Sequence, residues 1–143
     1  MQVKDVMTRG AECTRPDATL QEAAGRMKAL DVGALPVCDN DRLVGMLTDR
    51  DITVRSVSDG HDPRKDRVSD AMTPGVCYCF EDQDVTEAAR LMKEKQVRRL
   101  PVLNRDKRLT GIVSLGDLAV GAGDEEMAGQ ALEGISEPSA PKG

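Results

Sequence analysis

The hydrophobic pattern changes along the chain in a fixed order, and the same order occurs twice. Apolar side chains first recur every three or four residues, the spacing of one helix face, over 19–30 and again over 84–95. Thr19 and Glu22 have the spacing of a capping box, in which two side chains satisfy free backbone N–H groups at a helix start. One helix is therefore predicted in each copy of the pattern.

Each helix is followed by two short apolar runs joined by a polar turn, the pattern of a β-hairpin. A short strand precedes each helix, and another helix is predicted to begin at Thr48 or Ser114, where each hairpin ends. Each copy thus predicts a β-α-β-β-α unit with a small three-stranded sheet packed on helices, a fold of the α/β (α+β) class. The predicted strands are 12–15, 32–38 and 43–47 in the first copy, and 76–80, 97–103 and 109–113 in the second.

A shift of 65 positions aligns the two copies. With one extra residue near Lys107, 20 of the 50 positions from Val3 to Ile52 are identical. Two copies of this length indicate two like modules related by a pseudo-twofold axis, because a solenoid needs about three or more repeats. We expect a first unit over 1–62, a second over 63–122, and an acidic tail over 123–143.

Composition bears on the partners. Aromatic residues are 1% of the chain, which disfavours a nucleic-acid reader that stacks bases on aromatic rings. The formal net charge is -5, and 124–143 hold five acids against one base, so the repeated region is nearly neutral. We expect a loose helix over 125–132 and disorder through 137–141, since this composition cannot offset the ordering entropy. No apolar run approaches the roughly 18 residues of a membrane span, and no signal peptide precedes the repeat, so we expect a cytoplasmic protein.

The end of each hairpin carries the residues by which the chain resembles a known family. Gly45-Met46-Leu47-Thr48-Asp49-Arg50-Asp51 and Gly111-Ile112-Val113-Ser114-Leu115-Gly116-Asp117 each follow a strand that contains Leu-Pro-Val. This arrangement resembles the cystathionine β-synthase (CBS) domain, and its duplication resembles the tandem pair called a Bateman module. The likeness covers about residues 1–120.

The resemblance implies a sensor and not an enzyme. It implies that an adenosine-containing ligand binds in clefts between the two copies: AMP, ADP, ATP, an NAD-type dinucleotide or S-adenosylmethionine. Such modules usually regulate an attached enzyme or transporter, and because none is attached here the regulated protein is unknown. The family also implies a homodimer in which two tandem pairs form a flat disc, which would cover the apolar stripes of the two long helices.

The residues themselves support a ligand site. A hydroxyl at Thr48 stands where a helix begins, so free N–H groups there would suit a phosphate, and Arg50 would add a cation. Asp51 can accept hydrogen bonds from both hydroxyls of a ribose, as an acid does in dinucleotide folds. The alternative is that Thr48 with Asp51, and Ser114 with Asp117, are ordinary capping boxes with Asp in place of Glu.

The two copies differ around this site. The second has Leu115 and Gly116 where the first has an acid and an arginine, but it carries Arg98 and Arg99 on the preceding strand. Phosphate would then be bound by different arginines in the two copies, or by one cleft alone, and Asp51 is expected to matter at least as much as its counterpart. The candidate ligand-binding residues are Thr48, Arg50, Asp51, Ser114, Asp117, Arg98, Arg99, Pro36 and Pro101.

Four cysteines and one histidine leave other chemistry open. Cys13 and Cys38 lie on predicted parallel neighbours, which permits a disulfide or half a zinc site if their Cα atoms are within about 7 Å. Reduced thiols that pack as small hydrophobes are the simpler interpretation, and no metal is predicted. His61 is expected to be a solvated linker residue, and no base lies near a nucleophile, so no catalytic dyad is predicted.

Two functions from different classes therefore remain. The first is a stand-alone regulatory module whose halves adjust their packing when an adenosine ligand binds. The second is an interaction scaffold that has kept the fold without the ligand and responds to thiol oxidation or a metal. Stabilisation by nucleotides would separate them.

Overall fold

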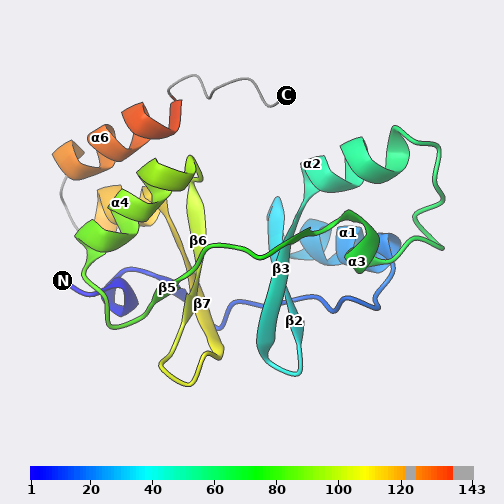
Figure 1. The fold of residues 1–143 in the computed structure, drawn as a ribbon, viewed down its shortest axis with the longest axis horizontal. Helices are drawn as coiled ribbons and strands as arrows, with labels where there is room; N and C mark the ends of the chain where they lie inside the picture. Colours follow the sequence, from blue (N-terminus) through cyan, green and yellow to red (C-terminus); the bar gives the residue numbers. More distant parts are fainter. Residues whose placement is uncertain (122–124, 137–143) are drawn as a thin grey trace. The chain divides into compact units, whose positions relative to one another are not determined.

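The computed structural model of the 143-residue chain describes residues 1–121 and 125–136. The chain is divided into two compact units (Figure 1). Glu12–Val76 form the first unit, and Met1–Ala11 together with the chain from Cys77 onward form the second unit. In each unit helices pack on a small sheet, which confirms the predicted fold class.

The first unit is a hairpin preceded by a capped helix. The Thr19 Oγ1 accepts the backbone N–H of Glu22 at 3.1 Å, so α1 begins where the sequence predicts. The second bond of a capping box, from the Thr19 N–H to the Glu22 carboxylate, is not among the bonds of this cap. The core residues Leu20, Ala23 and Met27 of α1 are buried in the same cluster as the inward side chains of the hairpin. Its sheet has the order β2-β3-β4. The elements are α1 (Leu20–Leu30), β2 (Ala34–Asp39), β3 (Arg42–Thr48), α2 (Asp49–Ile52), the π-helical turn η2 (Thr53–Val57), α3 (Val68–Ala71) and β4 (Thr73–Pro74).

The second unit repeats this plan with an added strand and helix. The Asp84 carboxylate accepts the N–H of Thr86 at 2.9 Å and caps the long helix, and the strands before and after this helix are parallel, as the crossover predicts. Its sheet has the order β1-β7-β6-β5. The elements are the 3-10 turn η1 (Val3–Asp5), β1 (Thr8–Arg9), β5 (Cys79–Phe80), α4 (Val85–Lys95), β6 (Arg99–Leu103), β7 (Leu109–Ser114), α5 (Leu115–Gly121) and α6 (Glu125–Ser136).

The segment before each sequence copy completes the sheet of the other copy. β1 pairs with β7 in the second unit, and β4, its equivalent in the repeat, pairs with β3 in the first unit. Glycine at the crossing makes this pairing fit: a Cβ on Gly45 would lie 2.9 Å from the Thr73 carbonyl oxygen, and one on Gly111 would lie 2.5 Å from that of Thr8. These two edge strands are not among the strands predicted from the sequence.

The predicted first strand of each copy is shorter than expected. Of the predicted strand 12–15, only Thr14 forms a bridge, which is parallel and pairs with Val37. Of the predicted strand 76–80, only β5 is formed. The Thr14 N–H donates to the Pro36 carbonyl at 2.9 Å and the Cys38 N–H donates to the Thr14 carbonyl at 2.9 Å. A β-bulge between Val37 and Cys38 then breaks the register of the hairpin at this point, and proline has no N–H with which to extend the ladder.

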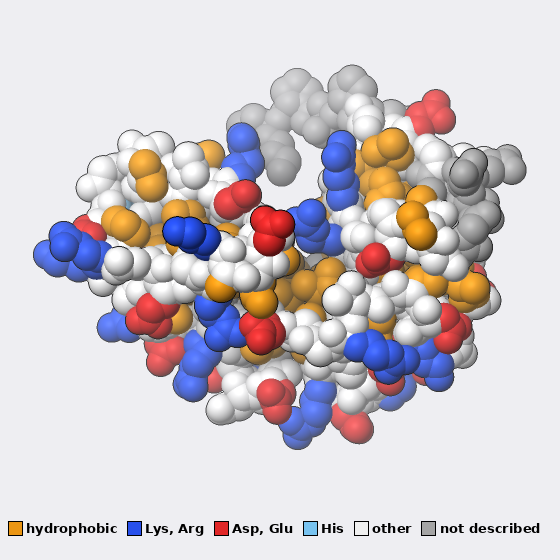
Figure 2. Space-filling model, turned by 180° about the vertical axis from the view of Figure 1, so that it is seen from behind, with side chains coloured by type: hydrophobic (Ala, Val, Ile, Leu, Met, Phe, Trp, Pro, Cys, Tyr) orange, Lys and Arg blue, Asp and Glu red, His pale blue; other side chains and the backbone are white. Residues whose placement is uncertain are grey.

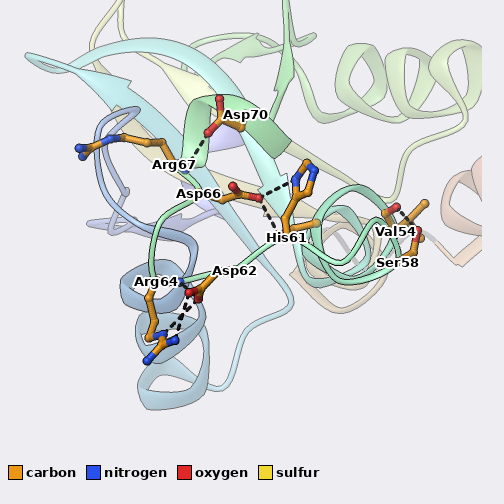
Figure 3. A network of polar contacts seen from close by, with 9 residues as sticks. Val54, Ser58, His61, Asp62, Arg64, Asp66, Arg67 and Asp70 are labelled. Carbon is orange, nitrogen blue, oxygen red and sulfur yellow. Dashed lines mark hydrogen bonds and ion pairs between the residues drawn. The ribbon is translucent and has the colours of Figure 1, made fainter.

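Polar contacts order the linker that follows η2 (Figure 3). The Asp66 carboxylate accepts the Ser56 hydroxyl at 2.9 Å and lies 3.0 Å from Nδ1 of His61. A further carboxylate, Asp70, accepts the backbone N–H of Arg67 at 2.8 Å, at the start of α3. His61 is therefore an exposed linker residue, as predicted, but one that Asp66 positions.

Helix α6 is longer and better anchored than the expected loose helix over 125–132. It lies beside α4, and its Ala131 is 1% exposed within the core of the second unit. The Gln96 side-chain amide donates to the Gly134 carbonyl at 3.3 Å, and Gly134 lies close against Lys93, where a Cβ would overlap the lysine side chain. The disorder expected over 137–141 lies outside the described residues.

Removal of residues 136–143 is expected to leave the melting temperature unchanged within error. Ser136 is exposed at the end of α6, and the last residues are expected from composition to add no packed surface. Removal of 125–143 is the matched control, and it should lower the melting temperature because it takes Ala131 out of the core. Calorimetry on both truncations checks the pair, and equal losses would contradict the expectation.

Candidate functional site

Both hairpins end in complete capping boxes. The Thr48 hydroxyl accepts the Asp51 N–H at 3.0 Å, and the Thr48 N–H donates to Oδ2 of Asp51 at 2.9 Å. In the second copy the Ser114 hydroxyl accepts the Asp117 N–H at 3.0 Å, and the Ser114 N–H donates to Oδ2 of Asp117 at 2.8 Å. The capping interpretation is thereby confirmed. It does not exclude a ligand role, because within the described part of the chain these cap bonds leave the Oδ1 of each aspartate without a hydrogen bond.

The helices that follow these caps are short. α2 has 4 residues and continues as the π-helical turn η2, and α5 has 7 residues. The partial charge at a helix start grows with aligned peptide dipoles and decays within a turn, so these ends add little to anion binding. Phosphate binding at either hairpin would depend on arginine side chains.

The second copy has a pocket at its hairpin end, which we call the second-copy pocket. It is an open depression with a volume of about 570 Å³. The Leu115 N–H donates to the Arg98 carbonyl at 2.8 Å. This bond fixes the start of α5 beside the beginning of β6. Arg98 and Arg99 are exposed, and neither is in an ion pair with any described residue. The pocket is lined by Arg98, Arg99, Ser114, Leu115, Gly116, Ala119, Gly129 and Leu132.

The equivalent place in the first copy is more acidic. The Asp49 N–H donates to the Gly33 carbonyl at 2.9 Å, which repeats the contact between Leu115 and Arg98. The Asp49 carboxylate lies over Gly33, so that a Cβ there would be 3.2 Å from Oδ2. Its Oδ1 accepts the Arg50 N–H at 2.8 Å. A carboxylate thus occupies the region that the second copy lines with two arginines.

The predicted site residues are only partly brought together. Arg98, Arg99 and Ser114 line one pocket, and Asp117 is bonded to Ser114 beside it. Pro36 and Pro101 are buried in their strands, where their carbonyl oxygens accept from the Thr14 N–H and, weakly, from the Cys79 thiol. Gly129 and Leu132 of α6 also line the pocket but were not predicted. The only sequence feature that pointed to them is the apolar spacing of this helix.

The cysteines are free thiols, and the parallel bridge between Thr14 and Val37 places Cys13 and Cys38 on neighbouring segments, as the sequence predicts. Burial raises the pKa of Cys38 to about 12, with further contributions from the charge of Cys13 and a thiol hydrogen bond to it. Burial also raises the pKa of Cys79 to about 12, and nearby Cys77 adds to the effect. Both buried thiols are protonated at neutral pH.

Cys13 and Cys77 are expected to react with iodoacetamide well before Cys38 and Cys79 at pH 8. The first two are half-buried, whereas the other two are buried and have raised pKa values. Peptide mass spectrometry of timed samples checks this order, with the urea-unfolded chain as the control in which all four should react alike.

The same two buried thiols predict a pH dependence of stability. Because these thiols ionise at lower pH in the unfolded chain than in the folded protein, the unfolding free energy should fall as the pH rises from about 9 toward 12.

A second pocket of about 460 Å³ lies beside β5 and α4, and the charges on the surface are mixed. Positive and negative side chains alternate over the face shown in Figure 2, without a broad patch of one sign. Among the side chains that the structure describes, no three of His, Cys, Asp or Glu are grouped so that they could hold a metal ion. None of the helices in the described part of the chain is both long and apolar enough to span a membrane.

The duplicated fold and its paired hairpin caps are those of a tandem domain module. The CBS domain family model matches residues 3–57 and again 68–121. The chain belongs to the CBS domain family, as the resemblance predicts.

Known proteins share this architecture along most of the chain. The CBS domain-containing protein YhcV of Bacillus subtilis is 43% identical over 134 residues, which are 94% of each chain. The crystal structure of hypoxic response protein I with two coordinated zinc ions is 39% identical with a TM-score of 0.77, and the match covers 83% of this chain and 97% of that one. The structure of CBSX2 in complex with AMP is 27% identical with a TM-score of 0.73, over 85% of this chain and 95% of that one.

Proposed function

We propose that the protein is a regulatory module that binds an adenosine-containing ligand in the second-copy pocket. The observation that carries the proposal is the pair Arg98 and Arg99, which form no ion pair with the described residues and line a 570 Å³ pocket. Ser114, which also lines it, is hydrogen-bonded to Asp117. Pockets of roughly 300–1,000 Å³ hold ligands of nucleotide size. The AMP complex of CBSX2 supports the same ligand class.

Each part of such a ligand has a matching group. Guanidinium groups form strong paired hydrogen bonds to phosphate, which suits Arg98 and Arg99. The Oδ1 of Asp117 can accept ribose hydroxyls while Oδ2 keeps the helix cap. The apolar remainder of the lining, including Leu115 and Leu132, suits a base. We assign no catalytic role to any of these residues.

The geometry favours the second copy over the first. We expected Asp51 to matter at least as much as Asp117 because Arg50 is its neighbour. Asp49, however, holds its carboxylate over Gly33, where it would repel a phosphate. We therefore propose the opposite order, with Asp117 the more important acid.

A thermal-shift screen tests the proposal. AMP, ADP, ATP, NAD and S-adenosylmethionine would each be added to the full chain, with adenosine and inorganic phosphate as controls for the two halves of a nucleotide. A ligand at 100 times its dissociation constant should stabilise the fold by about 2.7 kcal/mol. The expected result is stabilisation by at least one nucleotide, weaker at high salt, and no stabilisation by any of the five compounds would refute the function.

We also propose a homodimer, on the basis of exposed aliphatic side chains that lie mostly outside the two long helix stripes. Most of the apolar side chains of α1 and α4 are buried within their own units, apart from Leu30 at the end of α1, and α6 lies beside α4. Exposed aliphatic side chains remain in the first unit, at Leu30, Val32, Val54 and Val57. Contact between copies through this unit would cover them.

The expected mass in light scattering at micromolar concentration is twice that of the chain. Val54→Arg should shift the mass toward the monomer, because Val54 is 47% exposed and a charge there would oppose apolar contact between copies. Val120→Arg is the matched control, since Val120 is 86% exposed but belongs to the second unit. A monomeric parent chain would contradict the proposal.

A thiol-responsive scaffold is the second candidate function, and the position of Cys13 and Cys38 beside the parallel bridge between Thr14 and Val37 favours it. With oxidised glutathione, the Cys13 thiolate would attack one sulfur and release one glutathione. Cys38, deprotonated, would then displace the second, so that two thiols become one disulfide while one glutathione disulfide is reduced. If nucleotides fail to bind and oxidised glutathione removes two thiols from the count of four free cysteines, this candidate replaces the first. The grouping of described side chains does not favour zinc.

A further inference from the structure

Helix α6 lies beyond the part of the chain that the CBS family model matches, which ends at residue 121. It nevertheless belongs to the packed second unit. Ala131 is 1% exposed in the core cluster that includes Met92 and Leu118. The close approach of Gly134 to Lys93 adds a second point of attachment on α4.

A different side of the same helix lines the second-copy pocket. Gly129 and Leu132 are three residues apart and therefore share one face of α6. Both line the pocket with Arg98, Arg99 and Ser114, and Leu132 keeps 42% of its surface exposed. Ala131 and Gly134 lie three residues apart on the face that packs on α4. One helix thus contacts the core with one face and the pocket with another.

We propose that α6 is a wall of the ligand site, so that a nucleotide in the second-copy pocket contacts Leu132 as well as the arginines. This inference rests on the proposed function and deepens it. Since the ligand would contact both α6 and the body of the unit, binding and the docking of α6 stabilise each other. The coupling is reciprocal: a change that loosens α6 weakens binding, and a bound ligand holds α6 in place.

Charge substitutions on α6 in the full chain test the inference. Leu132→Glu places a carboxylate opposite Arg98 and Arg99 and removes an apolar contact, and Gln130→Glu is its control, with the same charge at an exposed position that does not line the pocket. In calorimetric titration with AMP and ATP, we expect Leu132→Glu to weaken binding at least about tenfold and Gln130→Glu to change it less than about twofold. Equal affinities in the two variants would overturn the inference.

Two further measurements guard against a misfolded variant. Leu132→Met keeps the volume and apolar character, so its affinity should stay near that of the parent. In the parent chain, AMP or ATP should slow hydrogen exchange of the α6 amides over 129–135, and unchanged exchange with a saturating nucleotide would overturn the inference. If the parent binds none of the five compounds of the thermal-shift screen, both the inference and the proposed function fail, and if only another of the five binds, that compound replaces AMP and ATP in these measurements. If a compound binds with α6 unaffected, only the inference fails.

Discussion

Replacing Asp117 with alanine is expected to weaken nucleotide binding by about 1.5–3 kcal/mol, the range for a hydrogen bond to a charged acceptor. The variant should also lose about 0.5–2 kcal/mol of unfolding free energy, because Asp117 completes a capping box with Ser114. Titration calorimetry and denaturant unfolding measure the two quantities on the same sample.

Asp51→Ala is the matched control for this variant. Its capping box has the same atoms at nearly the same distances, 2.9 and 3.0 Å, so the loss of stability should be similar. Its effect on nucleotide affinity should be small if the second-copy pocket is the main site. Unchanged affinity in both single variants and in the double variant would leave capping as the sole role of these acids.

Replacing Gly111 with alanine is expected to destabilise the fold by about 1–3 kcal/mol, the cost of overpacking a well-filled site. A Cβ at Gly111 would lie 2.5 Å from the Thr8 carbonyl oxygen and 2.9 Å from Sδ of Met7. The sulfur can move, but the carbonyl belongs to β1, so the edge strand itself must shift. Urea unfolding at fixed protein concentration checks the loss.

Gly25→Ala is the control, and its effect should have the opposite sign. Gly25 lies within α1 with nothing within 4 Å of an added Cβ, so alanine should stabilise the helix by about 0.5–1 kcal/mol. Gly45→Ala, at the equivalent place in the first unit, should behave like Gly111→Ala. Wild-type stability in the Gly111 variant would show that β1 does not hold the sheet edge.

Much of the fold could be predicted from the sequence because local signals repeat. Helix α1 begins at the predicted cap, and a helix followed by a β-hairpin recurs in both units. The edge strands β1 and β4 were missed because each is two residues long and pairs with a strand far along the chain, which periodicity cannot detect.

The residue types of the candidate site could be predicted from the sequence, but not which of these side chains lie together in one pocket. Ser114 and Asp117 were found from their spacing, since a cap and a ribose acceptor need the same residues. That Arg98 shares a pocket with Leu132 could not be predicted, because the docking of a tail helix depends on packing at Ala131 and Gly134. The acidic environment over Gly33 likewise depends on a side-chain orientation.

The placement of β1 has a consequence for synthesis on the ribosome. The first unit is one uninterrupted stretch, Glu12–Val76, so all of its internal contacts are available once this stretch has emerged. Met1–Ala11 emerge earlier, but their partner strand β7 is made about a hundred residues later. Met1–Ala11 are therefore paired later than the segment that directly follows them. Their residues Val3 and Met7, both buried in the finished protein, are covered in full only after Leu109–Ser114 have been made.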